Sequence, residues 1–178
     1  MSNGLFLCLS SSSPRPSFNF MFIPAFSREH ISVYTVNTEP IFFQHFDGPF
    51  YPTLRLLHKC DSVVPRRIIY IYIISDAICF IDPYILPKVQ VDRGAIRFLL
   101  AGAHMMCPGL TSAGGYLPPV EEVIPADSLV AIHAEGKEHA VGVGITKLST
   151  EDMKTINKGV GVETATYLGD DLWALQSL

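Results

Sequence analysis

Residues 91–112 read VDRGAIRFLLAGAHMMCPGLTS, and this stretch carries the clearest local signals in the chain. Asp92 can cap a helix, because its side chain accepts hydrogen bonds from the free N–H groups of a first turn. Gly102 can supply the left-handed residue that ends a helix, and Pro108-Gly109 marks a turn. Between them, apolar residues recur at the spacing of one helix face: Ile96, Leu99 and Leu100. The stretch therefore predicts a short helix followed by a sharp change of direction.

Short strands are expected on both sides of this helix. A strand ends at Val91, and β-prone segments follow at residues 105–106, 129–133, 140–148 and 160–168. Ser149 with Asp152 three residues later resembles a capping box, so a second helix is expected to run to Lys158, where Gly159 stops it. Short strands, frequent turns and two short helices are typical of a small mixed barrel of the α+β class.

The first half of the chain is less regular. Residues 1–27 are rich in Ser, Pro and Phe without an apolar period, which predicts a loosely ordered tail. Residues 31–36 and 41–43 predict a hairpin around Asn37-Thr38, and a helix is expected from Thr53 to Lys59. Residues 68–74 are uncharged and β-prone, so they form either a buried central strand or an aggregation-prone segment.

Composition narrows the class of protein. The chain has 178 residues, of which 48% are hydrophobic and 17% charged, enough to bury the core of one domain plus part of another. Its net charge of −4 argues against a protein held on nucleic acid by bulk charge. The 4 cysteines are widely spaced, which indicates reduced thiols and a cytoplasmic setting. The longest apolar stretch, residues 68–81, is shorter than the roughly 20 residues that span a bilayer, so no membrane association is expected.

Catalytic, metal and cofactor sites find little support. Ser112 lacks the glycine two residues before it that a nucleophile elbow needs, and Cys107 beside Pro108 is better explained as a small buried residue. His133 and His139 flank a hairpin loop without a third ligand at a recognisable spacing. The G-x-G pairs at 142–144 and 159–161 lack the third glycine and the lysine of nucleotide-binding loops. We therefore expect no catalytic residue, no metal and no cofactor.

The loop at residues 102–109 leaves two interpretations open. Its helix stop, methionines and Pro-Gly turn place backbone amides and adaptable side chains at a sharp bend, which could meet unstacked bases and phosphates. Lysines elsewhere in this half could add local positive charge: Lys137, Lys147, Lys154 and Lys158. From the spacing alone, a turn that lines the core is the simpler explanation.

Longer motifs carry a family resemblance. Residues 91–100 and 102–112 resemble the start of a PUA domain, and more narrowly that of the malignant T-cell-amplified sequence family of translation factors. Further stretches resemble later parts of that family: residues 134–140, 156–162 and 167–173. Upstream, residues 47–58 resemble the end of its N-terminal domain. The similarity covers about three quarters of the chain, judged by motifs.

The resemblance implies a fold and a function. The fold is a PUA pseudo-barrel, preceded by a partial α/β N-terminal domain. The implied function is non-enzymatic RNA binding on the small ribosomal subunit, in translation reinitiation and ribosome recycling, with rRNA and tRNA as RNA partners and density-regulated protein as protein partner. The RNA-binding residues carried over from PUA domains are Gly102, Ala103, His104, Met106, Pro108, Gly109, Lys158, Gly159 and Gly161.

The chain also departs from the family pattern. The family motif would run from Lys59 almost directly to Asp82, so residues 60–81 resemble an insertion with the composition of translated intron. We expect a tail at 1–27, an interrupted N-terminal domain at 28–90 and a PUA domain at 91–172. Gly169 and Asp171 stand where the family usually has Asn and Gly, which predicts an altered last turn.

Two alternatives to the translation factor follow from these departures. The chain could be a truncated, non-functional isoform or alternative gene product, because the strand-prone run at 68–74 would expose it to aggregation. It could also be a PUA accessory module of an RNA-modifying enzyme, although residues 1–90 show no methyl- or uridine-transfer signature. Salt-sensitive RNA binding separates the first alternative from a translation factor, and turnover would identify the second.

Overall fold

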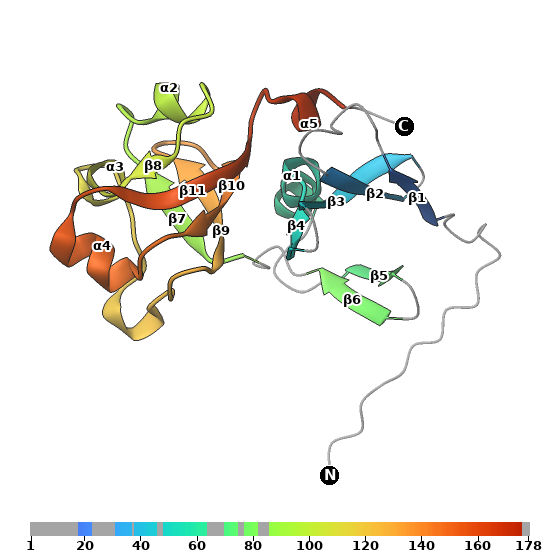
Figure 1. The fold of residues 1–178 in the computed structure, drawn as a ribbon, viewed down its shortest axis with the longest axis horizontal. Coiled ribbons are helices and arrows are strands. Elements are labelled where there is room, and N and C mark those ends of the chain that lie inside the picture. The colour runs from blue at the N-terminus through green and yellow to red at the C-terminus, as the bar shows by residue number, and fades with distance from the viewer. Residues whose placement is uncertain are drawn as a thin grey trace, which may run out of the picture.

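The computed structural model describes residues 18–22, 31–36, 38–45, 48–63, 70–74, 77–81 and 86–175. Three sheets are present in these ranges, with strand orders β1-β2-β3-β4, β7-β9-β10-β11-β8 and β5-β6. Figure 1 shows the five-stranded sheet in one part of the molecule and the four-stranded sheet in another, with α5 between them. No helix in the described ranges is long and apolar enough to cross a bilayer.

The five-stranded sheet belongs to a mixed α+β barrel. Its strands are β7 (Lys88–Val91), β8 (Met105–Met106), β9 (Leu129–Ala134), β10 (Ala140–Thr146) and β11 (Val160–Tyr167). β7 pairs with β9 in parallel, whereas the other ladders are antiparallel. Register shifts near Gly142 and Gly144 bend β10, which curls the sheet. The predicted pseudo-barrel is therefore confirmed, and each predicted strand of this half is present.

Short helices close this barrel. They are α2 (Ile96–Leu99), α3 (Cys107–Thr111), α4 (Thr150–Ile156) and the 3-10 helix η2 (Val120–Glu122). The Ser149 side chain caps α4 by accepting a hydrogen bond from the Asp152 N–H, as the capping pattern predicts. α4 ends earlier than predicted, because Asn157 adopts the left-handed conformation (φ 45°) two residues before Gly159. The two predicted short helices are α2 and α4, and a further one, α3, forms where the Pro-Gly turn at 108–109 winds into a helix.

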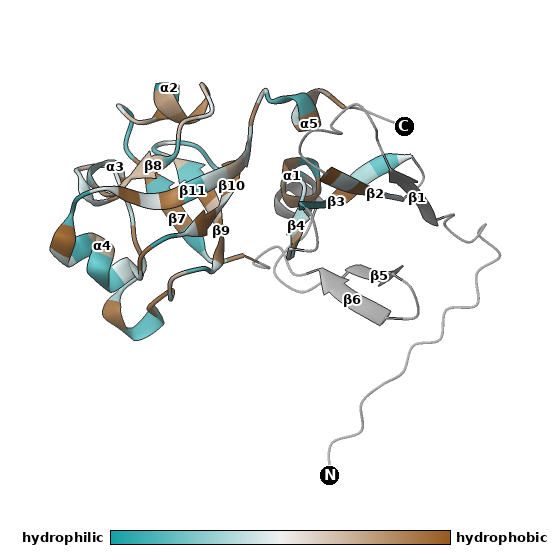
Figure 2. Cartoon of the chain, in the orientation of Figure 1, coloured by the Kyte–Doolittle hydropathy of each residue, from teal (hydrophilic) through white to brown (hydrophobic). Residues whose placement is uncertain are grey.

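The first core lies inside the barrel. It gathers side chains from the strands and from α2, α3 and α4, which Figure 2 shows as hydrophobic colour running through the inner strands. Its members are Val89, Val91, Leu99, Met105, Cys107, Leu110, Leu117, Ile124, Val130, Ile132, Ala134, Val141, Met153 and Val162. All of them lie between residues 89 and 162, so this region encloses a core from its own residues.

The four-stranded sheet is antiparallel. It contains β1 (Phe18–Phe22), β2 (Ile31–Val36), β3 (Glu39–His45) and β4 (Phe50–Pro52), and the β2–β3 hairpin is as predicted. β1 falls within the range 1–27, for which a loosely ordered tail is predicted. This strand is held by backbone hydrogen bonds to β2, and the pattern of apolar residues in the sequence gives no sign of such pairing. The remainder of that range lies outside the described residues.

α1 (Leu54–Val63) follows β4 and begins slightly later than predicted, because Pro52 belongs to β4 and Thr53 is the capping residue. The Thr53 hydroxyl caps it by accepting a hydrogen bond from the Leu56 N–H at 3.3 Å. The helix continues past Lys59 into the range 60–81 that resembles an insertion. Beyond it, β5 (Tyr70–Ile74) and β6 (Ala77–Ile81) form a two-stranded sheet that pairs with no other described strand. Of the two alternatives for residues 68–74, a central strand is excluded for the described part, and aggregation propensity stays a prediction.

A second core joins the four-stranded sheet and α1 to the barrel. Val33, Phe43 and Leu57 pack with Ala131 and Val143, which lie on β9 and β10. The rings of Phe43 and Tyr51 stack with centroids 4.9 Å apart. The elements of residues 31–63, called the N-terminal unit below, therefore bury their apolar face against the outer face of the barrel sheet.

Candidate nucleic-acid interface

The two segments carried over as RNA-binding lie side by side. β8 pairs antiparallel with β11, with Met106 opposite Val160 and Met105 opposite Val162. The Cys107 N–H extends this ladder by donating to the Gly159 carbonyl at 2.9 Å. The fold therefore brings residues 102–109 against 158–161, although about fifty positions separate them in the sequence.

β11 also holds the start of the loop. The Thr164 hydroxyl donates to the Ala103 carbonyl at 3.0 Å, and the Thr164 N–H donates to His104 Nδ1 at 3.2 Å. Because Nδ1 accepts, the neutral His104 ring carries its proton on Nε2. Gly102 ends α2 with φ 82°, a conformation that L side chains rarely adopt, so the predicted helix stop is confirmed. Gly102, Ala103 and His104 are all exposed.

The remaining predicted residues divide into exposed and buried ones. Met106 is 50% exposed, and Pro108 and Lys158 also face solvent. Gly109 and Gly159 are half-buried. Gly161 is buried, and an added Cβ would lie 3.1–3.3 Å from Leu110, Met153 and Cys107 side chains, so this glycine serves close packing rather than contact with a ligand.

A surface groove of about 680 Å³ lies between the start of α2 and the loop. Its rim includes Arg97, Phe98, His104, Met106 and Pro108. Phe98 is 51% exposed, and the Arg97 guanidinium lies 4.6 Å from the centre of its ring. Such a pair presents an aromatic face and a planar cation to solvent, which are the groups that stack on unpaired bases.

Arg97 and Phe98 are missing from the residues predicted from the sequence. The predicted apolar face of the helix comprises Ile96, Leu99 and Leu100, but α2 has only four residues, and Leu100 is 43% exposed beyond its end. Phe98 lies off that face, and an apolar residue off the buried face of a short helix is a signal that the sequence does contain. Figure 2 shows the hydrophobic colour of α2 at the surface.

Asp92 fixes the frame of the groove. Its Oδ1 accepts from the Ala95 N–H at 2.7 Å, its Oδ2 accepts from the Ser112 hydroxyl at 2.6 Å, and its own N–H donates to the Gly109 carbonyl at 2.9 Å. Asp92 is predicted to cap the helix itself; in the structure it bonds the turn that leads into α2, whose N-cap is Ala95. One side chain ties the start of the helical turn to the end of the loop, so the groove has a preformed shape.

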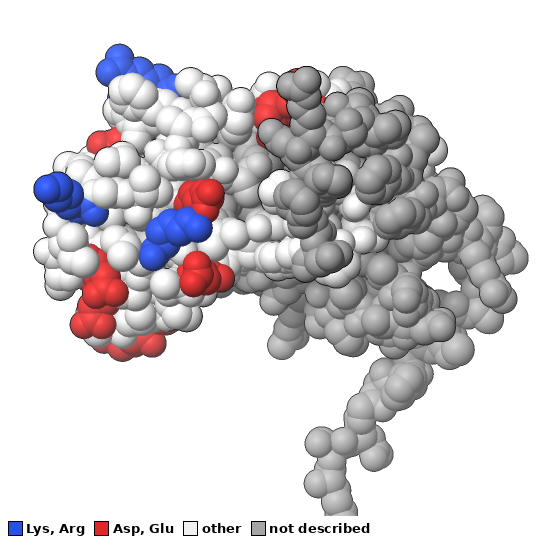
Figure 3. Space-filling model, viewed as in Figure 1, with Lys and Arg blue, Asp and Glu red and all other residues white. Residues whose placement is uncertain are grey.

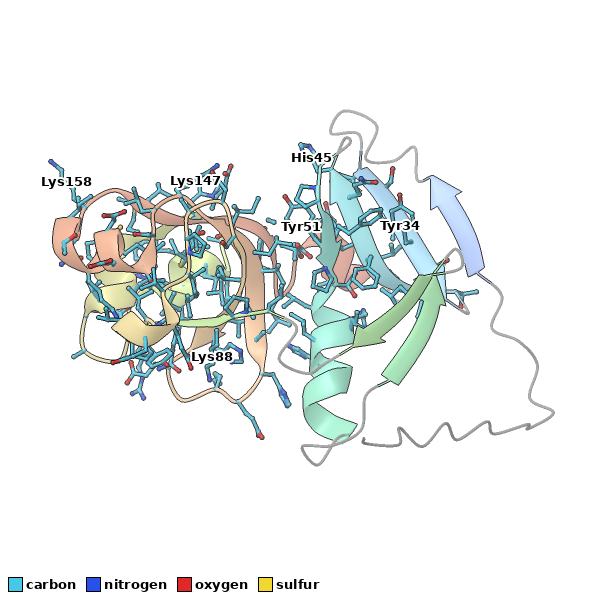
Figure 4. All side chains as sticks on the ribbon, turned by 90° about the horizontal axis from the view of Figure 1, so that it is seen from below. Tyr34, His45, Tyr51, Lys88, Lys147 and Lys158 are labelled. Atoms are coloured by element: carbon cyan, nitrogen blue, oxygen red, sulfur yellow. The ribbon has the colours of Figure 1, made fainter. Side chains whose placement is uncertain are left out.

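The charges around the groove are sparse. Lys147 forms an ion pair with Glu163 at 2.5 Å, and this contact lowers the pKa of the Glu163 carboxyl and raises the pKa of Lys147. The Lys154 ammonium donates to the Pro118 carbonyl. Figure 3 shows basic side chains standing apart from one another on the visible face, and Figure 4 places Lys158 at the far end of the barrel. A ligand in this groove would therefore meet a few separate cations rather than a basic patch on this face.

Groups considered for catalysis have structural roles. Cys107 is fully buried, burial raises the pKa of its thiol, and its Sγ contacts the Lys158 carbonyl at 3.5 Å. A protonated, enclosed thiol is a poor nucleophile, which fits the packing role. The Ser112 hydroxyl is bonded to Asp92. In the described ranges, no three His, Cys, Asp or Glu side chains gather as metal ligands would.

Comparison with known proteins agrees with this geometry. The PUA domain model matches residues 87–168, and the Pre-PUA-like domain model matches residues 20–60. Malignant T-cell-amplified sequence 1-A of Xenopus laevis is 48% identical over 149 residues, covering 84% of this chain and 68% of that protein. Translation machinery-associated protein 20 of Schizosaccharomyces pombe is 46% identical over 82% of this chain and 66% of its own length.

Solved structures show the same fold. A PUA-domain protein of Aeropyrum pernix, determined as a tartrate complex, superposes with a TM-score of 0.57 at 25% identity, covering 81% of this chain and 66% of that one. Barrel, loop and N-terminal unit thus have counterparts in relatives and in solved structures. The chain belongs to the malignant T-cell-amplified sequence family and carries its PUA and Pre-PUA-like domains.

Proposed function

We propose that this chain is an RNA-binding translation factor without catalytic activity, which acts in the cytoplasm on the small ribosomal subunit in reinitiation and post-termination recycling. The family membership supports a role in translation, and a relative is named as translation machinery-associated. The PUA domain supports RNA as the ligand.

The groove beside β8 is the observation that carries the proposal. It combines an exposed aromatic ring, an arginine stacked on that ring, and backbone groups at a bend, all on a frame fixed by Asp92. Stacking contributes about 1–3 kcal/mol per base and tolerates different sequences. An acidic protein with such a groove suits structured RNA that presents an unpaired base, where stacking compensates for few phosphate contacts.

Pairing with density-regulated protein is the part of the proposal that concerns the N-terminal unit. That unit packs against the barrel through Val33, Phe43 and Leu57, and its ordered fold supports the proposal of a protein partner. rRNA and tRNA are the RNA ligands proposed for the groove itself.

Co-sedimentation with purified small ribosomal subunits over a salt series tests the proposal. The matched variants are Arg97→Ala and Lys158→Ala at the interface, and Lys88→Ala on the opposite edge of the barrel in Figure 4. If each interface cation meets a phosphate, its removal lowers the magnitude of the salt slope by about 1 and leaves the chain folded. Lys88→Ala should keep the wild-type slope. Folded wild-type chain that does not pellet at low salt would refute ribosome binding.

A reinitiation reporter tests the finer part of the proposal. In a translation lysate depleted of its own family member, adding the wild-type chain should restore reinitiation, whereas the Arg97→Ala chain should not. Restoration by both chains alike would show that the groove is not the surface used.

A further inference from the structure

Trp173 on α5 (Asp171–Ala174) connects the end of the barrel to the N-terminal unit. The Arg55 guanidinium of α1 lies 4.7 Å from the centre of the Trp173 ring, and its Nη2 donates to the Trp173 carbonyl at 2.5 Å. The His58 ring, one turn further along α1, lies 5.2 Å from the same indole. His58 Nε2 also hydrogen-bonds the Ala140 carbonyl of β10 at 2.6 Å. Two residues of α1 therefore enclose one side chain from the C-terminal helix.

Asp170 makes α5 continuous with β11. Its Oδ1 caps the helix by accepting from the Trp173 N–H at 2.7 Å. Its Oδ2 accepts from the Thr166 hydroxyl at 2.6 Å and from the Tyr167 N–H at 3.0 Å. A single carboxylate thus ties the first turn of α5 to the last two residues of β11, so the two elements are held in one orientation.

Tyr167 ends β11 directly behind the RNA-facing loop. A Cβ added to Gly102 would lie 3.1 Å from both Cε1 and Oη of the Tyr167 ring. The ring therefore forms the wall against which the Gly102 turn rests. Since β11 also holds Ala103 and His104 through Thr164, the position of this strand's end determines where the loop stands relative to Phe98.

We propose that Arg55, Trp173 and Tyr167 are positioning residues for the groove: docking of the N-terminal unit onto α5 fixes the end of β11, and β11 fixes the loop at 102–104. This proposal rests on the proposed function of the groove as the RNA site. It assigns the N-terminal unit a part in RNA binding that requires no contact between that unit and RNA. The coupling is carried by a contiguous set of hydrogen bonds and ring contacts.

Two measurements on the full chain test this positioning. The first compares amide chemical shifts of Gly102, Ala103 and His104 in the 15N-labelled wild type, Arg55→Met, Tyr167→Leu and the control Lys88→Met. The second measures affinity for small ribosomal subunits with the same proteins. Arg55→Met keeps the length of the side chain while removing its hydrogen bond and cation, and Arg55→Lys restores the charge without the planar contact.

Arg55→Met and Tyr167→Leu should shift the three loop amides and weaken subunit binding by about 2- to 30-fold. Arg55→Lys should fall between Arg55→Met and the wild type, and Lys88→Met should match the wild type in both measurements. Thermal unfolding of each variant establishes that it is folded before binding is compared. If the contact only stabilises the packing of the N-terminal unit on the barrel, its loss would change the unfolding temperature. The chemical shifts of the loop amides and the affinity for the subunit would then stay as in the wild type.

Wild-type loop shifts and affinity in folded Arg55→Met and Tyr167→Leu would overturn the positioning role. In that case, weaker binding of the Phe98→Ala variant to subunits would still support the groove as the RNA site. If the wild-type chain fails to bind subunits, the proposed function fails, and the chemical shifts still decide the positioning because they need no RNA.

Discussion

The barrel and the N-terminal unit differ in where the residues of their buried cores come from. The barrel core consists only of residues between 89 and 162. The core under the N-terminal unit includes Ala131, Ala140 and Val143, which belong to barrel strands. A small sheet with one helix buries too little apolar surface to offset the conformational entropy lost when it folds. Here it buries its apolar face against the barrel sheet instead. The barrel should therefore fold alone, whereas the N-terminal unit should fold only on the barrel.

The largest expected effect comes from damage to the barrel core. Leu99 is fully buried, so Leu99→Ala should lower the free energy of unfolding by about 2–5 kcal/mol. Because the N-terminal unit depends on the barrel, both parts should unfold together in urea, followed by circular dichroism. Leu100→Ala, at a 43% exposed position, is the matched control and should change stability little. An N-terminal unit that stays folded after the barrel unfolds would contradict the dependence.

A truncated side chain in the second core should destabilise the N-terminal unit but not the barrel. Leu57 is 4% exposed in α1, and Leu57→Ala should destabilise the N-terminal unit by about 2–3 kcal/mol while the barrel keeps its stability. Native-state hydrogen exchange distinguishes the two parts: amides of β2 and β3 should lose protection, and those of β7 and β9 should keep it. Equal loss of protection in both would show that the two cores form a single cooperative unit.

Two exposed phenylalanines, one in each part of the molecule, allow the roles of the barrel and of the N-terminal unit in RNA binding to be compared. Phe98 on α2 is 51% exposed and Phe50 on β4 is 54% exposed, so replacing either by Ala should leave stability within about 0.5 kcal/mol. Phe98→Ala should weaken binding to small ribosomal subunits by about 5- to 150-fold, the loss of one stacked base. Phe50→Ala should bind like the wild type. Equal affinities for the two variants would remove Phe98 from the RNA site.

The smallest effect concerns the ion pair beside the groove. The hydrogen bond from Lys147 lowers the pKa of Glu163 from its ordinary value near 4.5, so the pair stabilises the fold above that pH. This contribution is lost as the pH falls through the lowered pKa of the folded state. Both side chains are more than 40% exposed, so solvent screens the effect and it is small. Urea midpoints at pH 7, 4 and 3 should fall less steeply for Glu163→Gln than for the wild type.

The barrel was predictable from sequence because its signals are local. Asp92, Ser149 and Gly102 act within a few residues of their own positions; Ser149 and Gly102 have their expected roles, and Asp92 bonds the turn just before α2. The candidate interface is a product of tertiary structure: residues 105–106 and 160–162 come together because β8 pairs with β11, and no short-range pattern records that pairing. The family resemblance, rather than spacing, identified the loop at 102–109.

The N-terminal unit was less predictable for a related physical reason. β1 is defined by its backbone pairing with β2, and the run at 68–74 offers the same β-prone composition whether a strand is central or part of an isolated hairpin. The roles of Arg55 and Trp173 depend on a contact between residues 118 positions apart. In the last turn Gly169 takes φ 98° and Asp171 begins α5, and an alteration of this turn relative to the family stays a prediction.

The shared second core also orders events during synthesis. The strands of the N-terminal unit leave the ribosome first, yet the faces of Val33 and Phe43 have no complete partner until residues 131–143 have been made. Folding therefore runs against the direction of translation: the barrel closes when β11 pairs with β8, and the earlier segment condenses onto it afterwards. During that interval we expect the aromatic and β-branched strands of residues 31–52 to be uncovered.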